Sequence, residues 1–154
     1  AMLYYIDTFP QKLHHPKEET YLFRRVKMRT READAAILKL EEQHRAGVEH
    51  VKALEMSLGK YQAGAPGGRE EFMAAAERFA DEIAVHMALE ENVLIPIAKH
   101  HLLDEDWAEI ARAFGENGDP RFGAEPDHEF RALFSRIVNL APPPIGVGPS
   151  GTAA

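Results

Sequence analysis

The stretch His86-Met-Ala-Leu-Glu90-Glu91-Asn-Val-Leu94 places a histidine and a carboxylate four residues apart in a segment with the apolar pattern of a core-facing helix. Side chains at this spacing on an α-helix lie within about 40° of each other on one face. His86 and Glu90 continue the three-and-four spacing of the apolar positions around them, which are Phe72, Ala76, Phe79, Ile83, Leu94 and Ile97. Both polar groups are therefore expected to face the core, where a metal ion is a partner that satisfies an imidazole and a carboxylate together.

The same pattern occurs a second time, at His14-His-Pro-Lys-Glu18-Glu19-Thr-Tyr-Leu22. A third segment, from Thr30 to about Gln62, has an apolar stripe at helical spacing, with a gap at position 44 that a histidine fills. The apolar members of this stripe are Ile37, Leu40, Val48, Val51, Leu54, Leu58 and Tyr61. The sequence thus predicts three helices that each carry ligand-type side chains on the inward face.

Composition narrows the class of protein. The chain has 154 residues, of which 45% are hydrophobic and 28% are charged, and this suits one domain, predicted for residues 1–141, with a Pro/Gly-rich tail at 142–154. A net charge of −7 argues against nucleic-acid binding and against attachment to anionic lipid. No apolar run is long enough to span a bilayer and no signal-peptide pattern opens the chain, so we expect a cytoplasmic protein. With no cysteine, any metal must be held by nitrogen and oxygen.

Proline and glycine divide the predicted helices. Pro10 and Pro16 are expected to kink or interrupt the first helix close to its ligand residues, because each removes a backbone donor and crowds the preceding turn. The run Gly64-Ala-Pro-Gly-Gly68 predicts a loop, so the His44 and His86 helices should pack antiparallel.

Two further helices are predicted after these. The first runs from about Asp104 to Glu116, and its inward residues are Trp107, Ile110, Ala111 and Phe114. In the second, Pro126 suits the first turn and the apolar face is Phe130, Leu133, Phe134, Ile137 and Leu140.

Two His-x-x-x-Glu-Glu helices that flank a helix with a central Glu42-Gln43-His44 resemble the hemerythrin-like, or HHE cation-binding, domain. The runs Asp106-Trp107 to Asn117-Gly118-Asp119-Pro120 and Phe134-Ser-Arg-Ile-Val-Asn-Leu-Ala-Pro142 resemble the C-terminal extension of many bacterial members. The resemblance implies an all-α, up-and-down four-helix bundle followed by two additional helices. Family members carry one more histidine ligand on an earlier helix, and because Ala1 opens without a helix-start signal we expect that first helix to be absent from this chain.

The same resemblance implies a non-haem di-iron centre, with two iron ions joined by an oxo or hydroxo bridge. In it Glu18 and Glu90 would bridge the two ions, and His14, His44 and His86 would be terminal ligands. Two readings of His15 stay open: it is a further metal ligand, or it is a histidine beside the ligands or at the surface that pairs with Glu19.

Several other polar residues have plainer interpretations. Glu91 is expected to be a solvated neighbour of Glu90 or an acceptor for a ligand imidazole. We expect His50 and His128 at the surface, and His100 and His101 near the terminal carbonyls of a helix.

The resemblance implies a protein that binds or senses O₂, NO or iron, with O₂, NO or peroxide as the small ligand and a homodimer as a possible assembly. The competing interpretations are a di-iron oxidase or peroxidase and a protein that stores iron or repairs iron centres. A third class is an interaction module whose metal controls folding. The alternative to all of these is a metal-free bundle in which the inward histidines and glutamates pair with one another.

Overall fold

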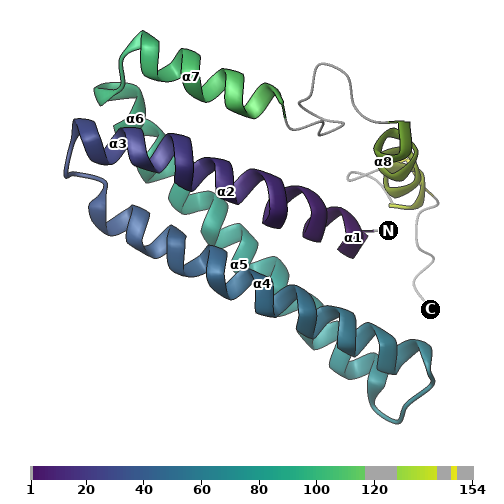
Figure 1. Ribbon diagram of the computed structural model, residues 1–154. Coiled ribbons are helices and arrows are strands. Elements are labelled where there is room, and N and C mark those ends of the chain that lie inside the picture. Colours follow the sequence, from purple (N-terminus) through teal and green to yellow (C-terminus); the bar gives the residue numbers. More distant parts are fainter. Residues whose placement is uncertain (1, 117–127, 142–146, 149–154) are drawn as a thin grey trace.

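The computed structural model describes residues 2–116, 128–141 and 147–148, and all the regular structure in these ranges is helical (Figure 1). Three long helical rods run side by side, at residues 2–29, 34–62 and 68–101. Two shorter helices follow, α7 (Asp104–Gly115) and α8 (His128–Leu140), close to the predicted bounds. The expectation of an all-α chain is therefore confirmed.

The first rod alternates between α-helical and π-helical turns. Its segments are α1 (Met2–Ile6), η1 (Asp7–His14), α2 (His15–Lys17), η2 (Glu18–Phe23) and α3 (Arg24–Arg29). Pro10 lies inside the π-helical segment η1, and Pro16 lies in the first turn of α2. The predicted interruption thus takes the form of wider turns in a rod that continues to Arg29, and such turns are frequent at functional sites.

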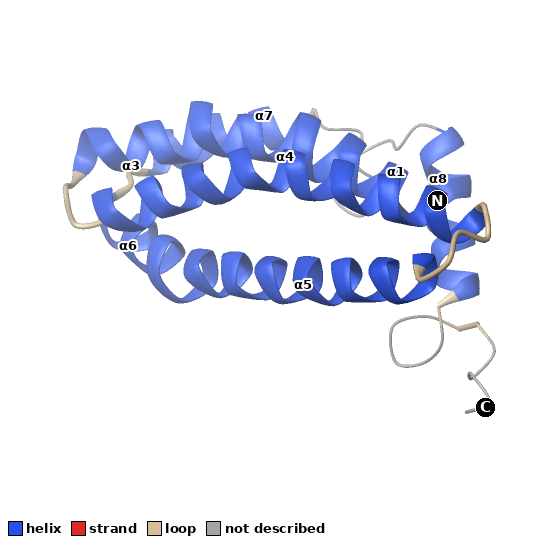
Figure 2. Ribbon diagram, turned by 90° about the horizontal axis from the view of Figure 1, so that it is seen from below, coloured by secondary structure: helices blue, strands red, loops and turns tan. Residues whose placement is uncertain are grey.

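The second and third rods form an antiparallel hairpin, as predicted. The second rod is α4 (Asp34–Gln62), and the third consists of α5 (Gly68–Leu89), the π-helical segment η3 (Glu90–Leu94) and α6 (Ile95–His101). Gly64 and Gly67 have positive φ values of 69° and 72°, a conformation that glycine adopts without steric cost. Seen from below, α5 lies across from α4 and the first rod (Figure 2).

The core consists of two apolar clusters on either side of a polar level. One cluster contains Phe23, Val26, Ile37, Leu40 and Leu94 among its buried members. The other is built on Val51, Leu54 and Phe79. On α4 the buried His44 falls between Leu40 and Val51, and on α5 the buried His86 falls between Phe79 and Leu94.

Two members of the predicted α4 stripe lie outside the core. Val48 is 41% exposed and Tyr61 is 45% exposed. Gly47 takes the inward position next to Val48, because a Cβ atom there would lie 2.7 Å from Nε2 of Gln11 on the first rod. At this one point of the stripe, the close approach of the two rods therefore moves the inward position from Val48 to Gly47, whereas Val51 and Leu54 are buried as predicted.

Helix α7 packs on the first rod through a buried ion pair. Asp106 is 1% exposed, and its carboxylate accepts hydrogen bonds from Nε and Nη2 of Arg29 at 2.8 and 3.2 Å. It also accepts one from the backbone N–H of Leu103 at 3.0 Å, which caps the helix. Of the predicted inward face of α7, Ile110 is buried and Trp107 and Phe114 are half-buried, whereas Ala113 is buried in place of the exposed Ala111.

The C-terminal part of the chain is described only in part. On α8, Leu133 and Ile137 are half-buried and Leu140 is 63% exposed. Pro126 and most of the predicted tail 142–154 lie outside the described residues, as do the side chains of Phe130 and Phe134. Among the described helices, none combines the length and the apolar character needed to cross a bilayer.

Candidate metal centre

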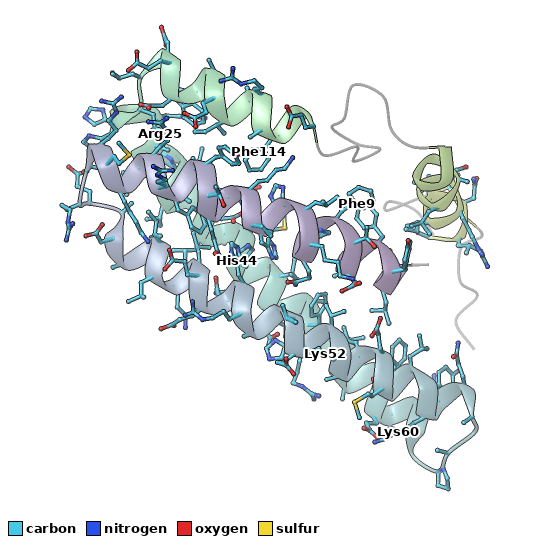
Figure 3. The ribbon with its side chains drawn as sticks, in the orientation of Figure 1. Phe9, Arg25, His44, Lys52, Lys60 and Phe114 are labelled. Atoms are coloured by element: carbon cyan, nitrogen blue, oxygen red, sulfur yellow. The ribbon has the colours of Figure 1, made fainter. Side chains whose placement is uncertain are left out.

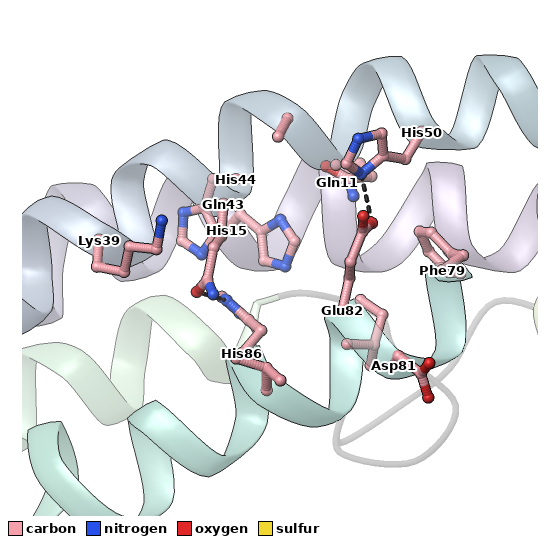
Figure 4. A pocket seen from close by; sticks show the side chains of 14 residues that line it. Gln11, His15, Lys39, Gln43, His44, His50, Phe79, Asp81, Glu82 and His86 are labelled. Atoms are coloured by element: carbon pink, nitrogen blue, oxygen red, sulfur yellow. Dashed lines mark hydrogen bonds and ion pairs between the residues drawn. The ribbon is translucent and has the colours of Figure 1, made fainter. Parts of the chain in front are cut away.

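Four ligand-type side chains meet between the two apolar clusters. They are His15 and Glu18 from the first rod, His44 from α4 and His86 from α5. One ligand atom from each lies within 4.8 Å of the others, and all four residues are buried. Figure 3 shows His44 in the middle of the bundle, and Figure 4 shows the three imidazoles close together.

Two more of the predicted residues, His14 and Glu90, lie next to members of this group. His14 Nε2 lies 3.0 Å from Oε1 of Glu18, and its side chain is 42% exposed. Glu90 Oε1 lies 3.1 Å from Nε2 of His86. The other oxygen of Glu18, Oε2, lies 3.4 Å from Nε2 of His44. The two oxygens of Glu18 therefore face two different histidines.

The π-helical turns explain which histidine of the first rod faces the centre. In a regular α-helix, His14 and Glu18 lie on the same face because they are four residues apart. The two side chains are also in contact in the structure. The wider turns of η1 and η2 advance each residue by a smaller angle, so the buried histidine is His15, with His14 at the edge of the site. The sequence placed both residues among the candidates, but its periodicity favoured the outer one.

Two polar side chains outside the cluster fix the orientation of the rings. Nδ1 of His44 lies 2.9 Å from Oε1 of Glu19, and Nδ1 of His86 lies 3.1 Å from Oε1 of Gln43. Each contact leaves the Nε2 atom of that ring facing the carboxylates at the centre, as in metal sites where an outer acceptor holds a ligand imidazole. One of the two readings of His15 paired it with Glu19, but in the structure Glu19 lies against His44. The sequence interpretation had no role for Gln43, although it directly precedes His44.

The protonation states favour cation binding for His15 and Glu18. Burial, with a further contribution from neighbouring His44, lowers the pKa of His15 to about 3, so its imidazole is neutral with a lone pair available. Burial works to raise the pKa of Glu18, but the attraction of the neighbouring His14 and His44 side chains outweighs burial and lowers the pKa.

Two other groups hold protons more tightly. Burial, with the nearby charge of Glu18, raises the pKa of Glu90 despite its contact with His86. For His44, burial opposes protonation, but the carboxylates of Glu18 and Glu19 outweigh it and raise the pKa. Bringing both Glu18 and Glu90 into their ionised forms in one buried site requires additional positive charge.

Buried polar atoms at this level lack hydrogen bonds among the described residues. They are Nδ1 of His15, Oε2 of Glu18, Nε2 of His44 and Oε1 of Glu90. The short distances between them are not matched by hydrogen-bond geometry, and leaving such groups unsatisfied costs about 1–3 kcal/mol each. A cation bound beside His15, Glu18 and His44, whose ligand atoms lie within 4.8 Å of one another, would satisfy these three groups, so the residues present fit a metal centre.

The remaining candidates lie away from the cluster. Glu91 and His100 are exposed, and His101 Nε2 lies 3.2 Å from Oε2 of Glu32 at the end of α6. Nδ1 of His50 lies 2.5 Å from Oε2 of Glu82 on α5, and the side chain of His50 is 42% exposed. The side chain of His128 is not among those described.

A cavity of about 340 Å³ adjoins the cluster. His15, His44 and His86 line its inner end, and the ion pair between His50 and Glu82 lies on its wall (Figure 4). The exposed side chain of Val85 is also part of its lining, so the cavity reaches the surface between α4 and α5.

Comparison with known proteins identifies the domain. No curated protein and no solved structure matches the chain significantly. The sequence matches the family model described as the hemerythrin HHE cation binding domain over residues 1–98, a stretch that includes all three rods up to the early part of α6. The chain therefore belongs to the hemerythrin HHE cation-binding domain family.

Proposed function

We propose that this chain binds two iron ions between its three long rods and uses them to bind or sense O₂ or NO. The observation that carries the proposal is a group of buried nitrogen and oxygen atoms on His15, Glu18, His44 and Glu90 that form no hydrogen bond with any residue that the structure describes. A bundle stabilised only by its own side chains would pair these atoms or replace them with leucine. Their persistence at one level of the core supports a bound cation.

The arrangement of the carboxylates supports two ions. Glu18 presents one oxygen toward His14 and the other toward His44, so a single carboxylate can serve two ions. Glu90 supplies a second carboxylate beside His86. Six groups then take part, namely His14, His15, Glu18, His44, His86 and Glu90, and this carboxylate and imidazole set suits a dinuclear site in a helical bundle.

The choice of iron follows from the donor atoms and from the family. The site offers imidazole and carboxylate groups and the chain has no cysteine, so soft metals are disfavoured. Bound iron would supply reversible one-electron chemistry and an open coordination position for a small ligand. The chain's own contribution is to hold the imidazoles in place through Glu19 and Gln43, and to flank the site with an apolar cluster on each side along the bundle.

A di-iron oxidase or peroxidase is the second candidate. The observation that favours it is the cavity, which gives a molecule larger than O₂ a route from the surface to the imidazoles. Peroxide or NO consumption by the iron-loaded protein in the steady state separates the two functions. Turnover well above that of free iron would favour the enzyme, and stoichiometric binding without turnover would favour the sensor.

Metal analysis of the purified protein, with an ultraviolet-visible spectrum, tests the centre itself. We expect about two irons per chain and a charge-transfer band from a bridging oxygen. The matched variants are Glu90→Ala and Glu91→Ala, which remove neighbouring carboxylates of which only the first faces the cluster. Glu90→Ala should lose iron, whereas Glu91→Ala should retain most of it. Equal loss from both variants, or a wild-type protein without stoichiometric metal, would contradict the proposal.

A further inference from the structure

The histidines of the proposed centre are held to different degrees. His15, His44 and His86 are buried, so the close-packed interior leaves their rings little freedom. The side chain of His14 is 42% exposed, and the water at its open side does not restrain it. Whether its ring stays facing Glu18 therefore depends on the contacts that the rest of the chain makes with it.

One of these contacts comes from outside the three rods. The ring of Phe114, on α7, lies 5.3 Å from the ring of His14 between centroids, and the two ring planes meet at 83°. This edge-to-face arrangement lies in the favoured range for aromatic pairs. Figure 3 shows Phe114 on the side of α7 that faces the first rod. The imidazole of His14 thus contacts an aromatic ring, while its Nε2 atom lies 3.0 Å from Oε1 of Glu18.

The end of α7 that carries Phe114 is tied to the first rod beside this contact. Lys17 donates a hydrogen bond from Nζ to the backbone carbonyl oxygen of Ala113 at 2.5 Å. Ala113 lies in the last turn of α7, where carbonyl groups have no partner within the helix and where the helix dipole favours a cation. Lys17 follows His14 by three residues and Ala113 directly precedes Phe114, so the hydrogen bond and the ring contact join the same two turns.

The core supports the ring of Phe114 as well. Phe114 is half-buried and packs against the apolar cluster that contains Phe23 and Leu94. If the ring turned away from His14, it would also lose these apolar contacts. Trp107 is likewise a half-buried aromatic residue of α7 that packs against this cluster, but it lies two turns earlier, about 10 Å away along the helix. Trp107 therefore provides a natural control for Phe114.

We propose that Phe114 is a positioning residue of the metal centre, which holds the imidazole of His14 toward Glu18 so that His14 can serve as a ligand. The inference rests on the function proposed above, since His14 is one of the six groups assigned to the two ions. The last turn of α7 is thereby a working part of the centre as well as a cover for the first rod.

Titration of the full-length protein with Co²⁺ tests the effect on metal binding, because the visible absorption of this ion reports its coordination. Phe114→Leu removes the ring and keeps an apolar side chain, and should weaken Co²⁺ binding about fivefold, which is the effect of one aromatic contact. Trp107→Leu makes a similar change away from His14 and should alter the affinity less than about twofold. Equal losses from the two variants would overturn the proposal.

A double-mutant cycle shows whether Phe114 acts through His14. In a His14→Gln background the ring that Phe114 positions is gone, so Phe114→Leu should weaken Co²⁺ binding further by less than about twofold. If Phe114 only stabilised the fold, its replacement would cost about the same fivefold in both backgrounds, and that result would overturn the proposal. Urea denaturation of the four proteins checks that each is folded under the conditions of the titration.

Nuclear magnetic resonance of the metal-free protein reports on the ring of His14 without any metal. In the wild type, a nuclear Overhauser effect is expected between the rings of Phe114 and His14. Phe114→Leu should lower the order parameter of the His14 ring and leave that of the buried His44 ring unchanged. Absence of the Overhauser effect, or an equally rigid His14 ring in the variant, would contradict the proposal.

The two kinds of measurement separate this inference from the proposed function. Binding of Co²⁺ by the wild type, together with an unaltered His14 ring in Phe114→Leu, would refute this inference alone. A loosened His14 ring in a protein that binds neither Co²⁺ nor iron would refute the proposed function alone.

Discussion

Two places in the described part of the chain hold buried charged groups, and the surroundings of the two differ. Between α3 and α7, the carboxylate of Asp106 receives hydrogen bonds from Arg29 and from the backbone of Leu103, and Arg25 lies 3.7 Å away. In the middle of the bundle, His15, Glu18, His44 and Glu90 each have a buried polar atom without a hydrogen bond within the described ranges. One cluster is completed by the chain itself, and the other is not.

The contrast separates a structural ion pair from a binding site. Arg29, which hydrogen-bonds to Asp106, lowers the pKa of that carboxyl, so the pair is ionised and internally neutralised. In the central cluster, burial, with the neighbouring charge of Glu18 added to it, raises the pKa of Glu90. Charge that the chain satisfies holds elements together, whereas charge that it leaves unsatisfied indicates a partner from outside the chain.

The largest stability effect is expected from the satisfied cluster. Asp106→Ala removes the helix cap and the hydrogen bonds from Arg29, and should lower the free energy of unfolding by about 2 kcal/mol, since Arg29 remains partly hydrated. Urea denaturation measures this change. Metal content should be unaffected, because Asp106 does not face the central cluster.

The matched control for this variant is Glu105→Ala. Glu105 contacts the same arginine at 3.3 Å, but its side chain is 76% exposed. Removing an exposed ion pair of this kind should change stability by less than about 1 kcal/mol. Equal losses from the two variants would mean that burial does not distinguish them.

A smaller effect of opposite sign is expected from the unsatisfied cluster. In metal-free protein, His15→Leu replaces a buried ring that has an unpaired nitrogen with an apolar side chain, and should raise the free energy of unfolding by about 1 kcal/mol. The same variant should bind metal less well than the wild type. His100→Leu, at an exposed position, is the control and should change neither property appreciably. If His15→Leu were less stable than the wild type, His15 would stabilise the fold as Asp106 does, and this would contradict its role as an unsatisfied ligand.

The pH dependence of metal-free stability refines the same comparison. The pKa of His15 is about 3 in the folded protein, against an ordinary value of 6.5. Between these values the unfolded chain binds a proton at His15 that the folded chain does not, so stability falls as the pH is lowered from about 6.5 toward about 3. Urea titrations of the wild type and of His15→Leu at several pH values in this window should diverge, with the wild type losing more stability at low pH. Parallel curves would contradict a buried neutral His15.

The raised pKa of His44 acts in the opposite sense and in a different window. Its contribution to stability is present below the unfolded value of 6.5 and is lost as the pH rises through the folded value. The carboxylates responsible, Glu18 and Glu19, remain in the His15→Leu variant, so the comparison of the two proteins reports on His15.

The sequence predicted the helices, and it predicted that His44 and His86 face inward. Both histidines continue the three-and-four spacing of the apolar residues, and this spacing indicates an inward position for a polar side chain as well as for an apolar one. The sequence did not predict which histidine of the first rod is buried. The α-helical period favours His14, but the first rod contains π-helical turns, and the buried histidine is His15. Val48 was misplaced because Gly47 admits Gln11 from another rod, a contact that no local pattern encodes. The buried role of Asp106 likewise depends on Arg29, which lies 77 residues away in the chain.

The π-helical segments η1, η2 and η3 have a consequence for how length changes would be accommodated in this domain. A hydrogen-bonded π turn contains one residue more than an α turn. Each π-helical segment therefore contains an extra residue within an otherwise regular rod. Loss of one residue inside such a segment can be absorbed by conversion to ordinary α-helix, with both flanking halves kept in phase with their neighbours. The same deletion in the middle of α4 would rotate every later side chain of that rod by about 100°. Deletion scanning should therefore find tolerant positions beside the ligands, where substitutions are least tolerated.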